Sequence, residues 1–100
     1  PINYALTAGE LKYILDQSGA RALFYDPDLS PTVDVMRRES KVEHFGLVRG
    51  GDGDILSTAL DKAAPVAPEA SAANEDHAQF CYTSGTTAAP KAAVMTHRAY

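Results

Sequence analysis

Residues 82–98 read Tyr-Thr-Ser-Gly-Thr-Thr-Ala-Ala-Pro-Lys-Ala-Ala-Val-Met-Thr-His-Arg, a hydroxyl-rich run followed by a single lysine. Four hydroxyl side chains surround Gly85 within positions 83–87, and Lys91 follows four positions after Thr87. Apolar residues precede the run at 78–82 and follow the lysine at 92–95. The pattern predicts a strand, a tight loop rich in hydrogen-bond donors, and a second strand.

The chemistry of this loop allows two interpretations. Backbone N–H groups in a turn form a concave anion site, and a lysine adds a mobile positive charge to it. Gly85 lets the backbone approach a ligand closely, and Pro90 stiffens the exit of the loop just before the lysine. Serine and threonine, however, also populate ordinary turns because they form local hydrogen bonds. Composition alone leaves a polyphosphate cradle and a plain turn equally open.

A Walker-type phosphate loop is excluded by spacing. That motif requires glycine, four residues, and then Gly-Lys followed by serine or threonine. After Gly85 the lysine comes six positions later, is preceded by Pro90 and is followed by Ala92. A phosphate site in this chain therefore needs a different architecture.

The stretch closely resembles the signature phosphate loop of the adenylate-forming superfamily, which includes acyl-CoA synthetases, aryl-CoA ligases, luciferases and peptide-synthetase adenylation domains. The family pattern is Tyr-Thr-Ser-Gly-Thr-Thr-Gly-x-Pro-Lys-Gly, followed by apolar residues and Thr-His-Arg. This chain keeps those positions except the last two glycines, which are Ala88 and Ala92 here. Residues 1–11, Pro-Ile-Asn-Tyr-Ala-Leu-Thr-Ala-Gly-Glu-Leu, also resemble the family's entry to a helix. The resemblance thus spans both ends of the chain.

The resemblance implies an ATP-dependent carboxylate–CoA ligase of fatty acid metabolism. Such an enzyme joins a fatty or aromatic acid to AMP as an acyl-adenylate, releases pyrophosphate, and passes the acyl group to coenzyme A. Residues 1–100 would be part of one AMP-binding N-terminal domain, with no catalytic residue assigned in this segment and no activity expected from it alone. Thr83 matches the position that helps hold Mg²⁺. The implied contacts to the ATP phosphates are Thr83, Ser84, Gly85, Thr86, Thr87 and Lys91.

Two other functions stay open within the same resemblance. The first is an adenylation domain that feeds a carrier protein instead of coenzyme A. The second is an impaired homologue that binds only nucleotide or a partner. Alanine in a left-handed backbone conformation costs about 1–2 kcal/mol. Ala88 and Ala92 would therefore weaken the loop if either position needs that conformation.

Composition restricts the remaining partners. The net charge is −4 and Arg37-Arg38 is the only basic pair, whereas nucleic-acid binding needs clustered positive charge. No apolar run approaches the roughly 20 residues of a membrane-spanning helix. Cys81, the only cysteine, cannot form an internal disulfide, which suits a reducing, cytoplasmic compartment. Within its apolar strand we expect Cys81 to pack as a small hydrophobic residue rather than act as a nucleophile.

The chain before the loop alternates helical and extended patterns. A capping box formed by Thr7 and Glu10 starts the first helix, and Gly19 ends it. Alternation of this kind predicts an α/β fold with a largely parallel sheet and with the phosphate loop at one end of that sheet. The predicted elements are a helix at 8–18, a strand at 22–25, a helix at 31–40, a strand at 42–48, a short helix at 55–63, an exposed connector at 64–76 and the strand that leads into the loop.

Other polar residues are assigned mainly structural positions. His97 follows the loop closely, so it either approaches the ligand or caps the helix expected to begin there. His44 has no metal-ligand or nucleophile partner at a useful spacing, and we expect a structural role for it. Arg37 and Arg38 are expected on a solvated helix face rather than on a phosphate.

Overall fold

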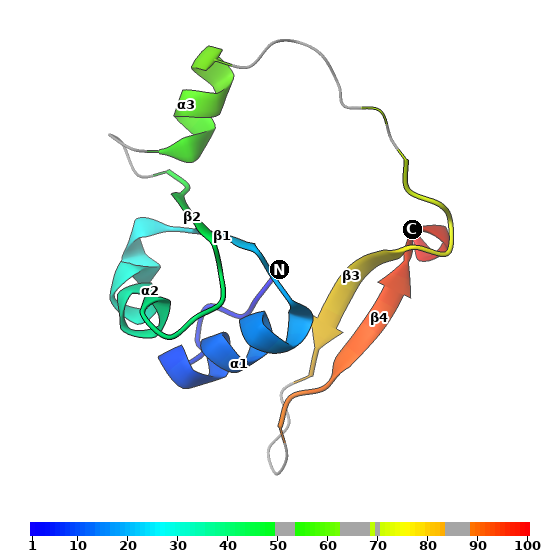
Figure 1. Ribbon diagram of the computed structural model, residues 1–100, viewed down its shortest axis with the longest axis horizontal. Helices are drawn as coiled ribbons and strands as arrows, with labels where there is room; N and C mark the ends of the chain where they lie inside the picture. The colour runs from blue at the N-terminus through cyan, green and yellow to red at the C-terminus, as the bar shows by residue number, and fades with distance from the viewer. Residues whose placement is uncertain (50–53, 63–68, 70, 84–88) are drawn as a thin grey trace. The chain divides into compact units, whose positions relative to one another are not determined.

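The computed structural model describes residues 1–49, 54–62, 69, 71–83 and 89–100 (Figure 1). The chain divides into two compact units: Asn3–Pro65, and Val66–Tyr100 together with Pro1–Ile2. Within the described residues, the first unit holds three α-helices and two strands, and the second holds a pair of strands.

Helix α1 (Ala8–Ser18) begins and ends where the sequence predicts. The Glu10 amide donates to the Thr7 hydroxyl at 3.4 Å, and the Thr7 amide donates to the Glu10 carboxylate at 2.8 Å. This reciprocal capping box satisfies amides that the first turn leaves without partners. Gly19 then takes the left-handed conformation at φ 69° and donates its amide to the Leu15 carbonyl. Both caps predicted from the sequence are confirmed.

Strands β1 (Ala22–Tyr25) and β2 (His44–Leu47) pair in parallel, with Leu23 opposite Phe45. A 3₁₀ turn, η1 (Pro27–Leu29), and helix α2 (Ser30–Arg37) connect them, because parallel neighbours require a crossover. The βαβ unit confirms the predicted alternation. The helix ends three residues earlier than the 31–40 prediction, and the strand is shorter than 42–48.

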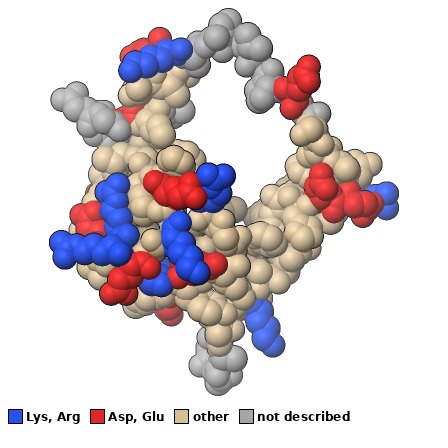
Figure 2. Space-filling view, in the orientation of Figure 1, with Lys and Arg blue, Asp and Glu red and all other residues tan. Residues whose placement is uncertain are grey.

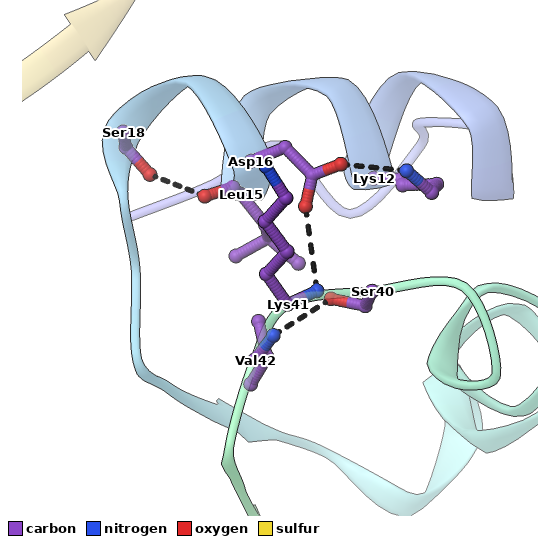
Figure 3. Close-up of polar contacts among 7 residues, drawn as sticks. All are labelled: Lys12, Leu15, Asp16, Ser18, Ser40, Lys41 and Val42. Atoms are coloured by element: carbon purple, nitrogen blue, oxygen red, sulfur yellow. Dashed lines mark hydrogen bonds and ion pairs between the residues drawn. The ribbon is translucent and has the colours of Figure 1, made fainter.

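Side-chain hydrogen bonds explain why β2 starts late (Figure 3). The Lys41 amide donates to Asp16 at 3.4 Å, and the Val42 amide donates to the Ser40 hydroxyl at 3.1 Å. Asp16 also accepts a hydrogen bond from the Lys12 ammonium at 2.6 Å, one turn earlier on α1. These bonds occupy backbone donors that a longer strand would use in its ladder.

The core of this unit lies where α1 and α2 meet one face of the β1–β2 sheet. Leu23, Tyr25 and Phe45 on that face are half-buried against it. On the opposite face, the Phe24 ring lies over Gly46 and is 58% exposed. The buried side chains of the core cluster are Leu11, Leu15, Val33, Met36 and Val42.

Helix α3 (Ile55–Lys62) confirms the predicted short helix at 55–63. Asp54 precedes it and is buried, and its carboxylate accepts a hydrogen bond from the Arg49 amide at 3.1 Å. Arg49 has a φ of 66°, which bulky residues rarely adopt. The Asp54 carboxylate therefore fixes the backbone just after β2, a contact that the sequence pattern did not reveal.

The second unit is built on an antiparallel pair, β3 (His77–Tyr82) and β4 (Ala92–Thr96). The α/β class is confirmed, but the sheet is parallel only in part, because one of the two described pairings is antiparallel. The connection at 83–91 contains no helical crossover pattern, and short connections join antiparallel neighbours. The two strands expected on either side of the hydroxyl run are confirmed, whereas residues 84–88 of the expected loop lie outside the described residues.

The segment before β3 is exposed wherever the structure describes it, at Glu69 and at residues 71–76. Residues 64–68 and 70 of the predicted connector lie outside the described part of the chain. No helix within the described residues has the length and apolar character needed to cross a membrane.

Candidate functional site

Thr83 directly follows β3 and Lys91 directly precedes β4, so these two residues lie at the two ends of the hydroxyl-rich stretch. The Thr83 amide donates to the Lys91 carbonyl oxygen at 2.9 Å, and the Thr83 hydroxyl donates to the same oxygen at 3.3 Å. This pairing continues the strand register, in which Tyr82 lies opposite Ala92, by one position. We call the pair Thr83–Lys91 the loop clasp.

Two of the six predicted phosphate contacts thus lie side by side at the loop clasp. Thr83 and Lys91 are both exposed, and the Lys91 ammonium takes part in none of the ion pairs formed between described residues. Exposed Lys91 opposite exposed Thr83 suits a phosphate ligand, because a lysine ammonium and a hydroxyl can both bind phosphate oxygens. The other four contacts, Ser84, Gly85, Thr86 and Thr87, lie outside the described residues and stay predictions.

Ala92, one of the two departures from the family pattern, lies in β4 opposite Tyr82. Among the described residues, Arg49 is the one non-glycine residue with positive φ, so Ala92 is not in a left-handed conformation. The backbone strain of about 1–2 kcal/mol that a left-handed alanine would carry is therefore absent at Ala92. Ala88, the other departure, lies outside the described residues.

Cys81 is half-buried in β3, as expected for a small hydrophobic residue. Its sulfur lies 3.6 Å from the Met95 sulfur on β4. A thioether is a weak hydrogen-bond acceptor and cannot serve as the base that a nucleophilic thiol requires. The contact lies between β3 and β4, and Cys81 is two positions before Thr83.

The opposite end of the hairpin is closed by the Thr-His-Arg segment. The His97 amide donates to the Asp76 carbonyl at 3.0 Å, the Arg98 amide donates to the Asn74 carbonyl at 2.9 Å, and the Arg98 guanidinium pairs with Glu75 at 2.7 Å. His97 follows Lys91 by six positions of extended chain, which corresponds to about 20 Å. Within the hairpin His97 therefore lies far from the loop clasp. Residues His97–Ala99 form a 3₁₀ turn, η2.

Among the described basic residues of the first unit, Arg37 and His44 each lie next to another side chain. Arg37 and Arg38 are both exposed, as predicted for a solvated helix face. The Arg37 guanidinium also stacks 4.4 Å from the centre of the Phe45 ring. His44 is exposed, with its imidazole 3.8 Å from the Glu43 carboxylate. On the face shown in Figure 2, the drawn lysine and arginine side chains are interspersed with acidic ones, unlike the clustered charge of a nucleic-acid surface.

Comparison with known proteins gives the family. The AMP-binding enzyme family matches residues 1–100. The long-chain-fatty-acid–CoA ligase FadD13 of Mycobacterium tuberculosis is 36% identical over 98 residues, which cover 97% of this chain and 19% of that protein. The fatty acid–[acyl-carrier-protein] ligase ScoC of Streptomyces coeruleorubidus is 33% identical over 100 residues, covering 100% of this chain and 18% of that protein.

Solved structures agree with this comparison. The anthranilate CoA ligase AuaEII, solved in complex with anthranoyl-AMP, matches 97% of this chain and 20% of its own chain, with a TM-score of 0.84 at 25% identity. This chain spans about a fifth of the length of the relatives it matches. Because the family match extends over the whole sequence, the chain belongs to the AMP-binding enzyme family.

Proposed function

We propose that this chain provides the ATP phosphate-binding loop of an AMP-forming acyl-CoA ligase. The observation that carries the proposal is the loop clasp, which brings the exposed Lys91 next to Thr83 at the two ends of the hydroxyl-rich run. Family membership supports it, because the relative FadD13 is named a long-chain-fatty-acid–CoA ligase.

In the proposed reaction, a carboxylate oxygen of the acid attacks the α-phosphorus of ATP, and the bond to the bridging oxygen breaks to release pyrophosphate. A thiol then displaces AMP from the acyl-adenylate and forms a thioester. Negative charge grows on the departing pyrophosphate, and prearranged donors and cations stabilise such charge. Lys91 supplies the cation in this segment. Donors come from the loop amides and from the hydroxyls of Ser84, Thr86 and Thr87.

Thr83 is proposed to lie on the metal side of the site. Its hydroxyl donates to the Lys91 carbonyl, so the two lone pairs of the hydroxyl oxygen are available to a cation. Mg²⁺, when bound with ATP, neutralises phosphate charge and orients the leaving group. Among the described residues no cluster of three or more His, Cys, Asp or Glu side chains is placed to hold a metal ion. The family resemblance implies that a glutamate from another part of the full-length protein would complete the metal site.

Two acceptors for the acyl group are considered. Coenzyme A is the primary proposal, because FadD13 and AuaEII are both named CoA ligases. A carrier protein is the alternative, which the 33% identity to the acyl-carrier-protein ligase ScoC favours. We propose a fatty or aromatic acid as the substrate, in line with the names of FadD13 and AuaEII. A cytoplasmic location is part of the same proposal, since coenzyme A chemistry and the single thiol fit a reducing compartment.

The third possibility, an impaired homologue, is supported at only one of its two positions. It rests on Ala88 and Ala92, and Ala92 lies in β4 without positive φ. The extended backbone at position 92 accepts alanine at no conformational cost. Position 88 alone keeps this possibility open.

The proposal is tested with full-length protein by acid-dependent exchange of labelled pyrophosphate into ATP, over a panel of fatty and aromatic acids. We expect exchange with at least one acid, loss of exchange when Mg²⁺ is chelated, and thioester formation with coenzyme A. Ser84→Ala is expected to raise the KM for ATP, whereas Ser71→Ala, an exposed serine of the same unit, is the matched control. Thioester formed only on a carrier protein would select the alternative acceptor, and no exchange with any acid would contradict the ligase proposal.

A further inference from the structure

Thr83 has been assigned both a phosphate contact and a metal contact, but its hydrogen bonds restrict what its hydroxyl can do. A threonine hydroxyl carries a single proton to donate. In this structure that proton is directed to the Lys91 carbonyl oxygen at 3.3 Å. While this bond is formed, Thr83 cannot also donate to a phosphate oxygen.

The same carbonyl oxygen accepts the Thr83 amide at 2.9 Å, so Thr83 provides two donors for one acceptor. A carbonyl oxygen has two lone pairs and can accept both hydrogen bonds at once. This arrangement fixes the peptide plane that follows Lys91 and hence the direction in which the Lys91 Cα–Cβ bond leaves the chain. The exposed Lys91 side chain forms no ion pair with another described residue.

We infer that Thr83 is a positioning residue: it orients Lys91 toward the phosphates through the loop clasp and does not itself donate to them. This inference rests on the proposed function and assigns a distinct role within the same site. The hydroxyl bond is longer than the usual 2.7–2.8 Å for two oxygens and is therefore the weaker of the two. Its removal is expected to loosen the clasp without unfolding the hairpin, because the amide bond remains.

The test compares Thr83→Val, which removes the hydroxyl and keeps the branched shape, with Thr83→Ser, which keeps the hydroxyl. Thr96→Val is the matched control, because Thr96 lies at the other end of β4 and its side chain makes no capping hydrogen bond. Two quantities are measured in full-length protein: hydrogen exchange at the residue 83 amide without nucleotide, and the KM for ATP at saturating Mg²⁺. Saturating Mg²⁺ removes any contribution from weakened metal binding.

We expect Thr83→Val to speed amide exchange at position 83 about 2- to 5-fold and to raise the KM for ATP by a similar factor, as loss of a weak hydrogen bond implies. Thr83→Ser should restore both values, and Thr96→Val should change neither. Unchanged exchange combined with a higher KM would overturn the inference, because the hydroxyl would then act on the ligand directly. Faster exchange with an unchanged KM would also overturn it, since the clasp would not orient the lysine. Wild-type protein that shows no ATP turnover would contradict the proposed function, while the exchange measurement would still report on the clasp.

Discussion

Replacing Ala92 by the glycine of the family pattern tests whether this chain carries an impaired loop. In a left-handed site the substitution would relieve about 1–2 kcal/mol, which corresponds to about a 5- to 30-fold faster adenylation step. Ala92, however, is extended in β4 opposite Tyr82 and has no positive φ, so there is no strain to relieve. Glycine instead loses about 0.5–1 kcal/mol through the greater freedom of the unfolded chain. The half-buried methyl group of Ala92 contributes a few tenths more.

We therefore expect Ala92→Gly to leave the rate of pyrophosphate release within about 2-fold of wild type and to lower stability by about 1 kcal/mol. The rate is measured under saturating ATP with the best acid, and stability is measured by urea denaturation of the full-length protein. Ala88→Gly is the comparison variant, because it restores the other family glycine. A rate increase above about 5-fold for Ala92→Gly would refute the reasoning from the backbone conformation.

Three further predictions concern the first unit, each checked by the free energy of unfolding in urea. Gly46→Ala would place a Cβ atom 2.9 Å from Phe24 Cδ1 and 3.0 Å from Ile55 Cδ1. We expect the unfolding free energy to fall by only about 1 kcal/mol, because Phe24 is 58% exposed and its ring can move. Stability equal to wild type would contradict this packing. Thr7→Ala removes the capping box of α1 and should cost about 1 kcal/mol, whereas a neutral effect would mean that the cap contributes nothing. The hydrogen bond from Lys12 lowers the pKa of Asp16, assisted by the bond from the Lys41 amide. Because the pKa of Asp16 is lower in the folded state, its ionised form stabilises the fold fully above the ordinary pKa of about 3.9, and this contribution is lost as the pH falls through the folded pKa. Asp16→Asn should therefore reduce the loss of stability seen below about pH 4. An unchanged dependence of unfolding free energy on pH would contradict this assignment.

Local sequence signals predicted much of the fold. The capping box of Thr7 with Glu10 and the terminal Gly19 act within a few residues, so the ends of α1 were predictable from the sequence. The start of β2 was not, because it depends on the Lys41 amide reaching Asp16 on another element. The antiparallel pairing of β3 and β4 also differed from the expected largely parallel sheet. The absence of a crossover pattern between these strands was the signal that pointed to this pairing.

The candidate site was predictable in composition but not in geometry. The motif alone identifies the hydroxyl run and Lys91 as candidate residues. The two hydrogen bonds from Thr83 to the Lys91 carbonyl were not predictable, because they depend on strand register. Strand register similarly places His97 at the far end of the hairpin, although it follows Lys91 by only six positions. Proximity in sequence along an extended strand is therefore a poor guide to proximity in space.

The central claim is that Lys91 and the hydroxyl run bind the triphosphate of ATP. The most direct measurement is kcat/KM for ATP in pyrophosphate exchange by full-length Lys91→Met, compared with Lys91→Arg and with the exposed Lys62→Met as a control. Loss of a hydrogen bond to a charged group predicts a decrease of about 10- to 100-fold for Lys91→Met, partial recovery for Lys91→Arg, and no change for Lys62→Met. A value for Lys91→Met equal to that of wild type would contradict the claim.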